Sequence, residues 1–505
     1  MMLQYILMSM AMSLVAWLYI KWVRVRSYWA ERGVPHQAPV PLLGSLTFLQ
    51  RENPGVWMRQ LYTSNRPYVG IWLLWRPALV VNSPEIARRI LVKDFANFRN
   101  RYLGSGDSDP VGALNLFSVN DPVWSSMRNR LSVIFTAAKL KMLQDYIGLK
   151  ARELAQRIRN DIENPINLKS MFVDYTTDVI GTSAFGVESN ATLTGEGPMR
   201  SITHDFAKFD LMRGLSWCCI FFFPDLVNCF RLKFFPKKSE NYLREVFNKI
   251  VKHREQHATG IIEVKDLLDA LIKVKKEKME NHEAISEDLL IAQAAVFLFA
   301  GFETSGSALS LITYELAFKP DIQEKVYREL KEAQERAGDV GDKDFDAKTL
   351  SELTYLNCCI KEGLRKYSPM GWLDRSAMTD YKIDDNLTVK AGTPVYINIT
   401  GMHYDPNYFP EPEKFHPDRF LPENERNIKP YTYMPFGEGP RFCIGLRFAQ
   451  MSLRYALSSI LLNFKLHPVP DKPLPDNIKM DNRCLLFLPG EPLMVQFEPR
   501  HSRTI

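Results

Sequence analysis

The sequence predicts a mainly α fold with a minor β-sheet region, in one large body that follows an apolar N-terminal helix. Nearly everything from 120 to 370 has helical periodicity, with polar connectors between the apolar stretches. Strand patterns occur only in short runs, at 68–82, 381–399 and 484–497. Of the 505 residues, 46% are hydrophobic and 24% are charged, which is enough apolar material for a large core. No internal repeat and no long low-complexity linker divides the chain.

The stretch Met1–Ile20 contains no charged residue and is long enough to span a bilayer as a helix. Lys21, Arg24 and Arg26 follow at once, so the positive-inside rule places the remainder of the chain on the cytosolic side. We therefore interpret residues 1–23 as a retained transmembrane signal-anchor. A cleaved signal peptide is the alternative, although a charged n-region and a small-residue cleavage site are both missing.

Residues 24–44 form a basic and proline-rich connector between this helix and the body. Its second half is expected to be stiff and extended, because Pro35, Pro39 and Pro41 restrict the backbone. We expect it to act as a hinge region that fixes the angle between the anchor and the body.

Charge and cysteine usage disfavour several classes of protein. A net charge of +6 over this length does not indicate nucleic-acid binding. None of the seven cysteines shows C-x-x-C spacing, which argues against zinc and iron–sulfur sites. Their odd number, without a disulfide framework, indicates a reducing compartment and agrees with a cytosol-facing body.

The body is expected to begin with a hairpin at 68–82 that turns at Arg76-Pro77. Ser83 then precedes a proline and a glutamate, which is the pattern of a capped helix. We expect this helix to run through Leu91.

Trp124 and Arg128 lie four residues apart on a helix that is expected to run to about Leu143. An indole N–H beside a guanidinium suits a carboxylate in a dry site. An ordinary cation–π pair between the two side chains is the alternative. Lys139 and Lys141, at the end of the same helix, are either positive surface for a redox partner or ordinary solvated lysines.

Residues 215–235 combine many aromatic side chains with a basic rim. Such a cluster suits insertion into an anionic membrane surface, but a buried core segment has the same composition. We favour membrane contact. The apolar members are Leu215, Trp217, Ile220, Phe221, Phe222, Phe223, Leu226, Phe230, Phe234 and Phe235, and the rim consists of Arg231, Lys233, Lys237 and Lys238.

The longest apolar helix of the body is expected at 291–316 and contains the sequence A-G-F-E-T, which starts at Ala300. Glycine and an acidic residue are unfavourable inside a buried helix, so this sequence needs a reason. The Thr304 hydroxyl can compete for the Ala300 carbonyl, and Gly301 leaves the groove uncrowded. We expect a local widening that holds O₂ and water, with Glu303 and Thr304 relaying protons. A helix–helix contact made by small residues is the alternative.

Glu362 and Arg365 are three residues apart on a predicted helix, which alone is a common salt-bridge spacing. The segment 412–420, P-E-K-F-H-P-D-R-F, follows later in the chain. His403 and His416 lie in Pro/Asp-rich stretches, and we interpret both as ordinary loop histidines rather than metal ligands.

Residues 436–445, F-G-E-G-P-R-F-C-I-G, place Cys443 in a turn directly before a helical pattern. Oriented N–H groups and the positive end of the helix dipole are expected to lower the pKa of this cysteine and favour the thiolate. Flanking glycines allow close backbone approach. A thiolate held in this way suits a metal, while a structural cysteine in a turn is the alternative.

These segments, in this order, resemble the motifs of the cytochromes P450: W-x-x-x-R, A-G-x-[DE]-T, E-x-x-R, P-x-x-F-x-P-x-R-F and F-x-x-G-x-R-x-C-x-G. The resemblance covers essentially the whole body and is greatest for the membrane-anchored microsomal enzymes of animals, in particular insect members that oxidise xenobiotics. It implies the P450 fold, with haem between the long central helix and the cysteine loop, and makes residues 45–505 the haem-thiolate catalytic domain. Ser368 departs from the pattern, since relatives commonly carry a second proline there, and it is expected to loosen the following turn.

The same resemblance implies the role of each candidate residue. Cys443 would be the axial thiolate ligand of haem b, and Thr304 and Glu303 would be catalytic. Glu362, Arg365 and Arg419 would form a structural ion network behind the haem loop. No Cys-x-x-Cys-His occurs, so the haem would be bound non-covalently. The residues expected to contact the haem are Trp124, Arg128, Ala300, Gly301, Arg375, Phe436, Gly437, Arg441, Cys443 and Gly445, with Trp124, Arg128, Arg375 and Arg441 at its propionates.

The implied function is haem-thiolate monooxygenation of a lipophilic small molecule at the endoplasmic reticulum membrane. Electrons would come from NADPH-cytochrome P450 reductase, with cytochrome b5 as a further candidate donor. An O₂-independent haem-thiolate isomerase or dehydratase and a non-enzymatic haem-based binding protein are the alternatives. Substrate contacts are expected from five apolar stretches: Leu114–Val119, Phe206–Met212, Phe297–Gly301, Met370–Leu373 and Leu485–Phe487.

Overall fold

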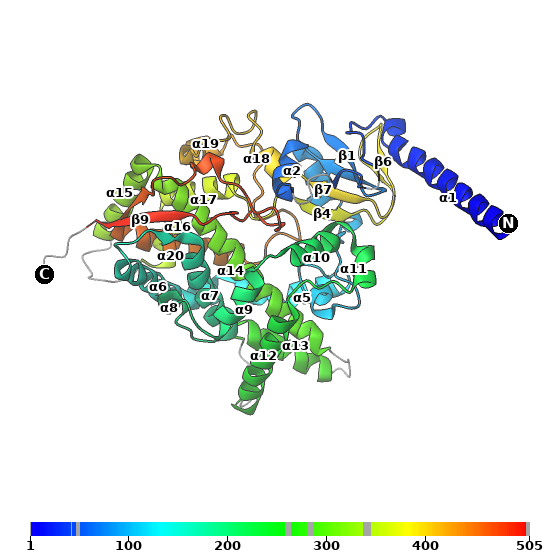
Figure 1. Cartoon of the computed structure of the whole chain (residues 1–505). Coiled ribbons are helices and arrows are strands. Elements are labelled where there is room, and N and C mark those ends of the chain that lie inside the picture. The colour runs from blue at the N-terminus through cyan, green and yellow to red at the C-terminus, as the bar shows by residue number, and fades with distance from the viewer. Residues whose placement is uncertain are drawn as a thin grey trace.

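The computed structural model describes residues 2–41, 43–46, 51–257, 264–280, 286–336 and 345–500. Within these ranges the chain is mainly helical and forms three small sheets, which confirms the predicted fold class. Helices make up most of the body, while the largest sheet lies at the end nearest the N-terminal helix (Figure 1).

Two long helices form the centre of the body. α14 (Glu287–Ala317) packs along α7 (Leu168–Phe185), and both are buried over most of their length. α14 is apolar all round, which is the pattern of a helix enclosed by protein, and Glu287 and Asp288 in its first turn complement the helix dipole. It is long enough to cross a membrane, but 83% of its apolar window is buried inside the body, so it is a core helix. α6 (Ala137–Asn160) and α20 (Leu446–Asn463) pack around this pair.

The remaining α-helices are distributed along the rest of the described chain. They are α1 (Met2–Ser27), α2 (Pro54–Gln60), α3 (Pro84–Arg88), α4 (Pro110–Leu114), α5 (Val123–Leu131), α8 (Ala191–Thr194), α9 (Pro198–Ala207), α10 (Leu211–Phe222), α11 (Pro224–Phe230), α12 (Lys237–His257), α13 (Leu267–Glu280), α15 (Pro320–Arg336), α16 (Ala347–Glu352), α17 (Thr354–Lys366), α18 (Ile399–His403) and α19 (Pro422–Glu425).

The largest sheet of the described chain has the strand order β1-β2-β7-β4, with β2 and β7 parallel and the other pairs antiparallel. Its strands are β1 (Tyr68–Leu73), β2 (Arg76–Val81), β7 (Pro394–Ile397) and β4 (Leu373–Ser376). A second sheet, in the order β3-β9-β8, joins β3 (Ile166–Asn167), β9 (Met494–Pro499) and β8 (Phe464–Pro468). β5 (Tyr381–Lys382) and β6 (Thr388–Val389) pair with each other.

Two predicted element boundaries are wrong. The hairpin turns two residues earlier than expected, at Leu74 and Trp75 instead of Arg76 and Pro77. Leu74 adopts a positive φ of 53° there. The single helix expected from Trp124 to Leu143 is divided into α5, a 3₁₀ turn and α6, because Thr136 is extended (φ −69°, ψ 153°) and starts a new helix.

The helix that follows the hairpin begins as predicted, because the Ser83 hydroxyl accepts a hydrogen bond from the Ile86 N–H at 3.3 Å. Its α-helical part ends at Arg88, and a π-helical turn at Arg89–Lys93 carries it past Leu91.

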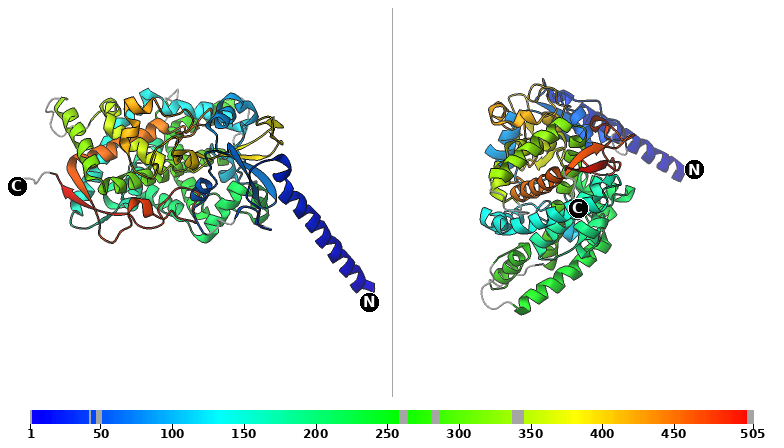
Figure 2. Two further views of the ribbon diagram at one scale, coloured as in Figure 1. Left: turned by 90° about the horizontal axis from the view of Figure 1, so that it is seen from above. Right: turned by 90° about the vertical axis from the view of Figure 1, so that its left-hand side faces the viewer.

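α1 has no buried residue and extends away from the body (Figures 1 and 2). Its C-terminal end is held on β1 by tryptophans. The Trp72 indole N–H donates to the Val25 carbonyl at 2.8 Å, and the fully buried Trp29 donates to the Ile71 carbonyl at 3.0 Å. The contacts that position α1 therefore begin before the prolines of the connector.

The aromatic cluster at 215–235 divides into a buried and an exposed part. Trp217, Phe221, Phe222, Phe234 and Phe235 are buried, and Trp217 and Phe235 contact the Phe299 ring of α14 at 5.3 and 6.2 Å between ring centroids. Most of the cluster is therefore core, contrary to the membrane interpretation. Phe230 is 64% exposed, and Leu211, Met212 and Leu215 add exposed apolar surface on α10.

Candidate functional site

The cysteine loop at 436–445 is shaped by its glycines and leads directly into α20. The Cys443 N–H donates to the Phe436 carbonyl at 2.8 Å. Gly437 and Gly439 both have φ +72°, where other residues are strained. A side chain at Gly439 would also place its Cβ 1.9 Å from the Leu91 carbonyl oxygen. Gly439 was not among the predicted site residues, although a glycine in a tight loop can indicate a position that does not tolerate a side chain.

Gly445 has a different role from the other glycines of the loop. It is the N-cap of α20 and has an ordinary φ of −88°. Its nearest neighbour outside the loop is the Phe135 ring at 3.9 Å from an ideal Cβ, and Phe135 stacks on Phe297 of α14 at 5.6 Å. Phe135 thus connects the cysteine loop to the central helix.

The Cys443 side chain has accessible surface, yet enough protein surrounds the thiol to raise its pKa. Burial raises the pKa of the thiol, while the Gly445 N–H and the Arg128 guanidinium act in the opposite direction. The expected lowering of the pKa is therefore wrong for the protein alone, because desolvation outweighs the local dipoles. A bound metal ion would itself remove the proton. The sulfur is sheltered but unobstructed, as a metal ligand must be.

Basic side chains from separate parts of the chain lie around the loop. The Arg441 guanidinium covers the Trp124 ring at 4.2 Å, and its Nη2 donates to the Val119 carbonyl at 3.1 Å. Arg128 lies over the Phe442 ring at 4.9 Å. The indole of Trp124 therefore contacts Arg441, which the W-x-x-x-R spacing did not indicate.

Arg375, on β4, is fully buried, and its Nε has no hydrogen-bond partner within the described part of the chain. Its Nη1 donates to the carbonyl of Asp374 at 2.7 Å. The Asp374 carboxylate is paired with Arg101 at 2.6 Å. Arg101 was missed at the sequence level, since nothing near it in the sequence marks it.

Burial lowers the pKa of Arg375 to about 9 and that of Arg441 to about 8, and in both cases Arg101 adds repulsion between cations. Three guanidiniums thus share the Asp374 carboxylate, and Asp121, the other carboxylate that acts on Arg441, is already paired with Arg99 at 2.6 Å. Buried charge of one sign is costly unless it is paired. The cluster therefore fits a ligand that carries two negative charges, such as the two propionates of haem.

On α14, the Thr304 hydroxyl donates to the Ala300 carbonyl at 2.7 Å, as the sequence predicts. Ala300 and Thr304 both retain accessible surface, and the element stays α-helical throughout. The role expected for Gly301 is wrong. A Cβ at Gly301 would lie 2.5 Å from the side chain of Ile180 on α7, so this glycine permits close helix packing rather than an open groove.

Glu303 is fully buried on the side of α14 that faces α7, and Lys169 lies 3.7 Å from its Oε1. Neither carboxylate oxygen has a hydrogen-bond partner within the described residues. Burial raises the pKa of Glu303, and the cations Lys169, Arg213 and Arg200 oppose this rise. Lys169 lies 131 residues before Ala300, the first residue of the motif, so it could not be found from spacing.

Behind the loop, Glu362 lies between Arg365, at 2.8 Å, and Arg419, at 3.2 Å. His403 extends this network, and its interpretation as a loop histidine is wrong. It is fully buried at the end of α18, its Nδ1 is 3.0 Å from the Arg365 carbonyl, and its Nε2 accepts the Met434 N–H at 3.0 Å. The ring therefore connects the network to the start of the cysteine loop. His416 is an exposed loop residue, as expected.

Four of the five predicted substrate stretches are brought together in two pairs, since Phe206 lies 6.3 Å from Phe299 and Met370 forms a β-bridge with Leu486. Leu116 donates its N–H to the Gln293 side chain of α14 at 2.9 Å, which lies outside the predicted stretch of that helix. Ser368 is buried and donates to the Met370 carbonyl at 3.0 Å. It therefore stabilises the turn that it was expected to loosen.

The residues present fit a haem in composition and charge. Cys443 offers an accessible side chain, the nearby carboxylates do not offset the burial of the Arg375 and Arg441 guanidiniums, and Ala300 and Thr304 keep accessible surface on α14. Fold and site together define a protein of the haem-thiolate class.

Comparison with known proteins agrees with this class. A family model described as Cytochrome P450 matches residues 34–497. Cytochrome P450 6k1 of Blattella germanica is 34% identical over 487 residues, which are 92% of each chain. Probable cytochrome P450 6g2 of Drosophila melanogaster is 33% identical, covering 95% of this chain and 96% of its own, and cytochrome P450 9c1 of the same fly is 30% identical. The chain belongs to the cytochrome P450 family, which consists of haem-thiolate monooxygenases and thus of oxidoreductases.

Proposed function

We propose that this chain is a microsomal monooxygenase that binds haem b non-covalently and inserts one oxygen atom of O₂ into a lipophilic small molecule, a xenobiotic or an endogenous lipid. The other oxygen atom leaves as water, which takes up two electrons and two protons. NADPH-cytochrome P450 reductase supplies the electrons, and cytochrome b5 is a second candidate donor. The observation that carries this proposal within the family is the hydrogen bond from the Thr304 hydroxyl to the Ala300 carbonyl at 2.7 Å.

Each group has a separate task in this proposal. Haem, when bound, supplies the reductive activation of O₂. Cys443 would hold the haem iron through its sulfur, and Arg128, Arg375, Arg441 and the Trp124 indole would hold the propionates. Thr304 holds a proton at its hydroxyl, which its hydrogen bond to Ala300 keeps in one orientation.

Glu303 is the proposed source of that proton. It lies next to Thr304 in sequence but is fully buried toward α7, where Lys169, which is 27% exposed, lies 3.7 Å from its Oε1. Lys169 therefore stands between the buried carboxyl and solvent. Lys169 would therefore connect the proposed proton path to solvent on the α7 side of the molecule.

The reductase is proposed to dock on the side of the cysteine loop. Exposed Lys141 and Met142, at the start of α6, and Phe442, which is 43% exposed, supply mixed basic and apolar surface there. The lysines lie at the start of α6 rather than at the end of the α5 helix, contrary to the sequence prediction.

Membrane attachment is proposed to use α1 and the exposed part of α10 and α11. α1 is long and apolar enough to span a bilayer. Met212 and Phe230 are 66% and 64% exposed, and Arg231 follows directly, which suits shallow contact with an anionic surface. Because basic residues follow the apolar stretch, we propose that the catalytic domain lies on the cytosolic face of the endoplasmic reticulum.

The test is reconstituted turnover of a library of lipophilic compounds with reductase, NADPH and isotopically labelled O₂. We expect one labelled oxygen atom per product molecule, and no product without reductase. Product that forms without label or reductase would favour an isomerase or dehydratase. Bound ligand without any product, at full haem loading, would favour a binding protein.

A further inference from the structure

The end of α1 lies beside the tip of the β1–β2 hairpin, at the end of the body from which α1 extends (Figures 1 and 2). The Lys21 ammonium is 4.9 Å from the centre of the Trp17 ring and 5.4 Å from that of the Trp75 ring. The rings of Trp22 and Trp75 are 6.2 Å apart between centroids. Lys21 therefore contacts a tryptophan of α1 and a tryptophan of the hairpin at once.

Lys21 determines how deep the hairpin tip lies in a bilayer that α1 crosses. No side chain of α1 before Lys21 is charged. A lysine at the end of an apolar span keeps its ammonium among the lipid headgroups, and tryptophans are enriched at the same depth. A side chain in contact with Lys21 and Trp22 shares this depth. Trp75, and with it the turn of the hairpin, is therefore brought to the headgroups.

The chain after Lys21 follows the hairpin without a free linker. Four contacts in sequence order join residues 22–35 to residues 75–70 of the hairpin, so each step along one segment is matched by a step back along the other. Trp29 also lies against Gly70, where a Cβ would come within 2.5 Å of the indole. α1 and the hairpin are therefore held as one unit. The four contacts are those between the Trp22 and Trp75 rings, between the Trp72 indole and the Val25 carbonyl at 2.8 Å, between the Trp29 indole and the Ile71 carbonyl at 3.0 Å, and between the Gly70 N–H and the Pro35 carbonyl at 2.8 Å.

Exposed apolar side chains lie next to the hairpin. Val40 and Gly44 exchange backbone hydrogen bonds at 2.8 and 2.9 Å, and Gly44 forms a β-bridge with Leu73. These bonds hold Val40 and Leu43 beside the hairpin, where they are 40% and 46% exposed. Apolar side chains that are fixed and exposed next to a membrane span are suited to contact with lipid.

The hairpin tip also adjoins one of the helices for which membrane contact is proposed. Arg76, which follows Trp75, forms an ion pair with Asp225 of α11. Phe230, at the end of the same helix, is 64% exposed. The exposed apolar side chains of α11 and those beside the hairpin are thus connected through the tip.

We propose that Val40, Leu43, Leu74 and Trp75 form a surface that contacts the headgroups and upper acyl chains of the phospholipid bilayer that α1 spans. We call it the hairpin surface. Because α1 is docked on the same hairpin, the tilt of the body on the membrane is set by α1 and its tryptophan contacts, and the prolines of the connector do not contribute. This inference rests on the proposed membrane attachment and adds a contact surface and a fixed tilt to it.

The depth of the hairpin surface is measured by electron paramagnetic resonance of spin-labelled, haem-loaded full-length protein in nanodiscs of phosphatidylcholine and phosphatidylserine. The label is attached at Leu43→Cys or, as a control, at Leu193→Cys, which replaces an exposed leucine of α8 in the half of the body away from α1 (Figure 1). Exposed Cys229 is replaced by serine in both. We expect the Leu43→Cys label to collide more with O₂, which dissolves in lipid, than with a water-soluble nickel chelate. The Leu193→Cys label should show the opposite preference.

The tilt of the body is measured by polarised absorbance of the haem in oriented bilayers of the same lipids. Trp29→Phe combined with Trp72→Phe keeps both rings but removes the two N–H donors that join this segment to the hairpin. We expect this double variant to lose much of the wild-type dichroism, because the body then tilts over a wider range. Pro39→Ala combined with Pro41→Ala should leave the dichroism unchanged.

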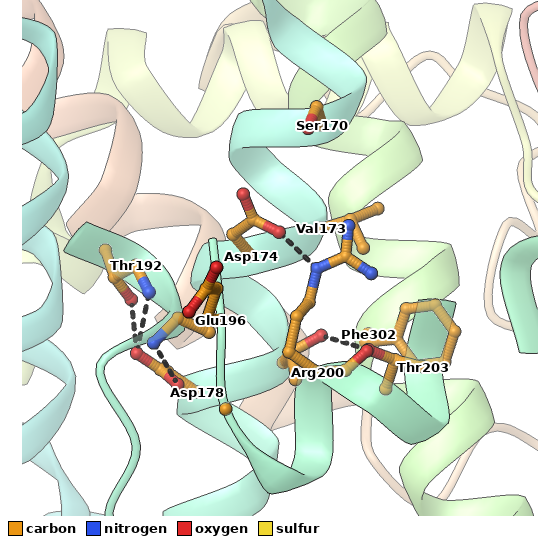
Figure 3. A network of polar contacts seen from close by, with 12 residues as sticks. Ser170, Val173, Asp174, Asp178, Thr192, Glu196, Arg200, Thr203 and Phe302 are labelled. Carbon is orange, nitrogen blue, oxygen red and sulfur yellow. Dashed lines mark hydrogen bonds and ion pairs between the residues drawn. The ribbon is translucent and has the colours of Figure 1, made fainter. Parts of the chain in front are cut away.

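Thr192→Val is the control for a general loss of stability. The Thr192 hydroxyl is buried and donates to the Asp178 carboxylate at 2.8 Å, within a polar network that includes residues of α7, α8 and α9 (Figure 3). Its removal costs one buried hydrogen bond on α8, away from the hairpin, and should leave the dichroism at the wild-type value.

The outcomes separate this inference from the membrane attachment on which it rests. Protein that washes out of the bilayers would count against attachment by α1 and thereby against both. Protein that stays bound while the Leu43→Cys label prefers the nickel chelate would overturn the hairpin surface alone. Dichroism that is equal in wild type and the double tryptophan variant, or that falls as far in the proline variant, would overturn the fixed tilt.

Discussion

Arg375 and Arg441 carry buried positive charge that Asp374 alone does not balance. Without a ligand these guanidiniums repel one another, and with a dianionic ligand they bind it. Each of these arginines should therefore destabilise the haem-free protein and stabilise the haem-bound protein. This is the clearest consequence of the site at the scale of single residues.

Arg375→Met should weaken haem retention while leaving the haem-free protein as stable as wild type or slightly more stable. Loss of a hydrogen-bonded charge pair costs about 1.5–3 kcal/mol, so haem should dissociate about tenfold faster or more. Haem transfer to an acceptor protein measures the rate, and thermal unfolding of the haem-free form measures stability. Equal destabilisation of both forms would show that Arg375 is only a packing residue.

Thr304→Ala should reduce product formation and increase peroxide release, on the order of tenfold or more in their ratio. Among the described residues, the hydroxyl bonds only within its own helix, so the unfolding temperature should change little. Product and peroxide are measured in one assay against the electrons consumed. An unchanged ratio would remove Thr304 from the proton path.

His403 makes stability depend on pH in a definite direction. Burial and the neighbouring Arg365 lower the pKa of His403 to about 3, whereas an imidazole in the unfolded chain titrates near 6.5. The folded protein therefore binds fewer protons than the unfolded chain between these values. The part of the stability that depends on neutral His403 should be fully present above pH 6.5. It should be lost, by several kcal/mol in total, as the pH drops toward 3.

His403→Gln removes this titrating group while keeping a polar side chain between Arg365 and Met434. Denaturant unfolding at several pH values should show a weaker loss of stability on acidification than in wild type. The substitution is expected to lower stability at neutral pH, so the slope and not the absolute value decides. Identical slopes would mean that His403 titrates normally in the folded protein.

At the scale of elements, the contact between α14 and α7 sets how the central helix is placed beside the cysteine loop. The two helices lie close together at Gly301, since a Cβ there would meet the Cγ1, Cδ1 and Cβ atoms of Ile180 at 2.5–3.0 Å. Phe302, the next residue, accepts a hydrogen bond from Thr176 of α7 at 2.9 Å, which keeps the two helices in register.

Gly301→Ala should destabilise the fold by about 1–3 kcal/mol, because it overpacks this contact. Ile180→Ala in the same chain should restore part of the loss, since the two side chains would share one space. Denaturant unfolding of the single and double variants checks both statements. Simple additivity of the two losses would contradict the close contact.

At the scale of the whole molecule, motifs that act within one segment could be predicted from the sequence. The bond from Thr304 to Ala300 and the pairing of Glu362 with Arg365 follow from helical spacing alone. Gly301 was misjudged because its partner, Ile180, lies on a separate helix. His403 was misjudged because burial, which decides its role, has no local signal.

Long-range partners explain the remaining omissions. Arg101 and Lys169 act on Asp374 and Glu303, which lie far along the chain, and only the folded arrangement brings these charges together. The aromatic cluster at 215–235 shows the same limit. Its aromatic side chains are buried at Trp217 and exposed at Phe230, although both belong to one apolar stretch of the sequence. Composition identifies the kind of side chain but not the face on which it lies.

The assignment of Cys443 as the haem ligand supports every other part of the account. The direct measurement is the absorbance spectrum of the reduced, CO-bound protein, for wild type, Cys443→Ala and the exposed control Cys229→Ala. We predict a thiolate-type band in wild type and in Cys229→Ala, and none in Cys443→Ala. A thiolate-type band that persists in Cys443→Ala would contradict the account.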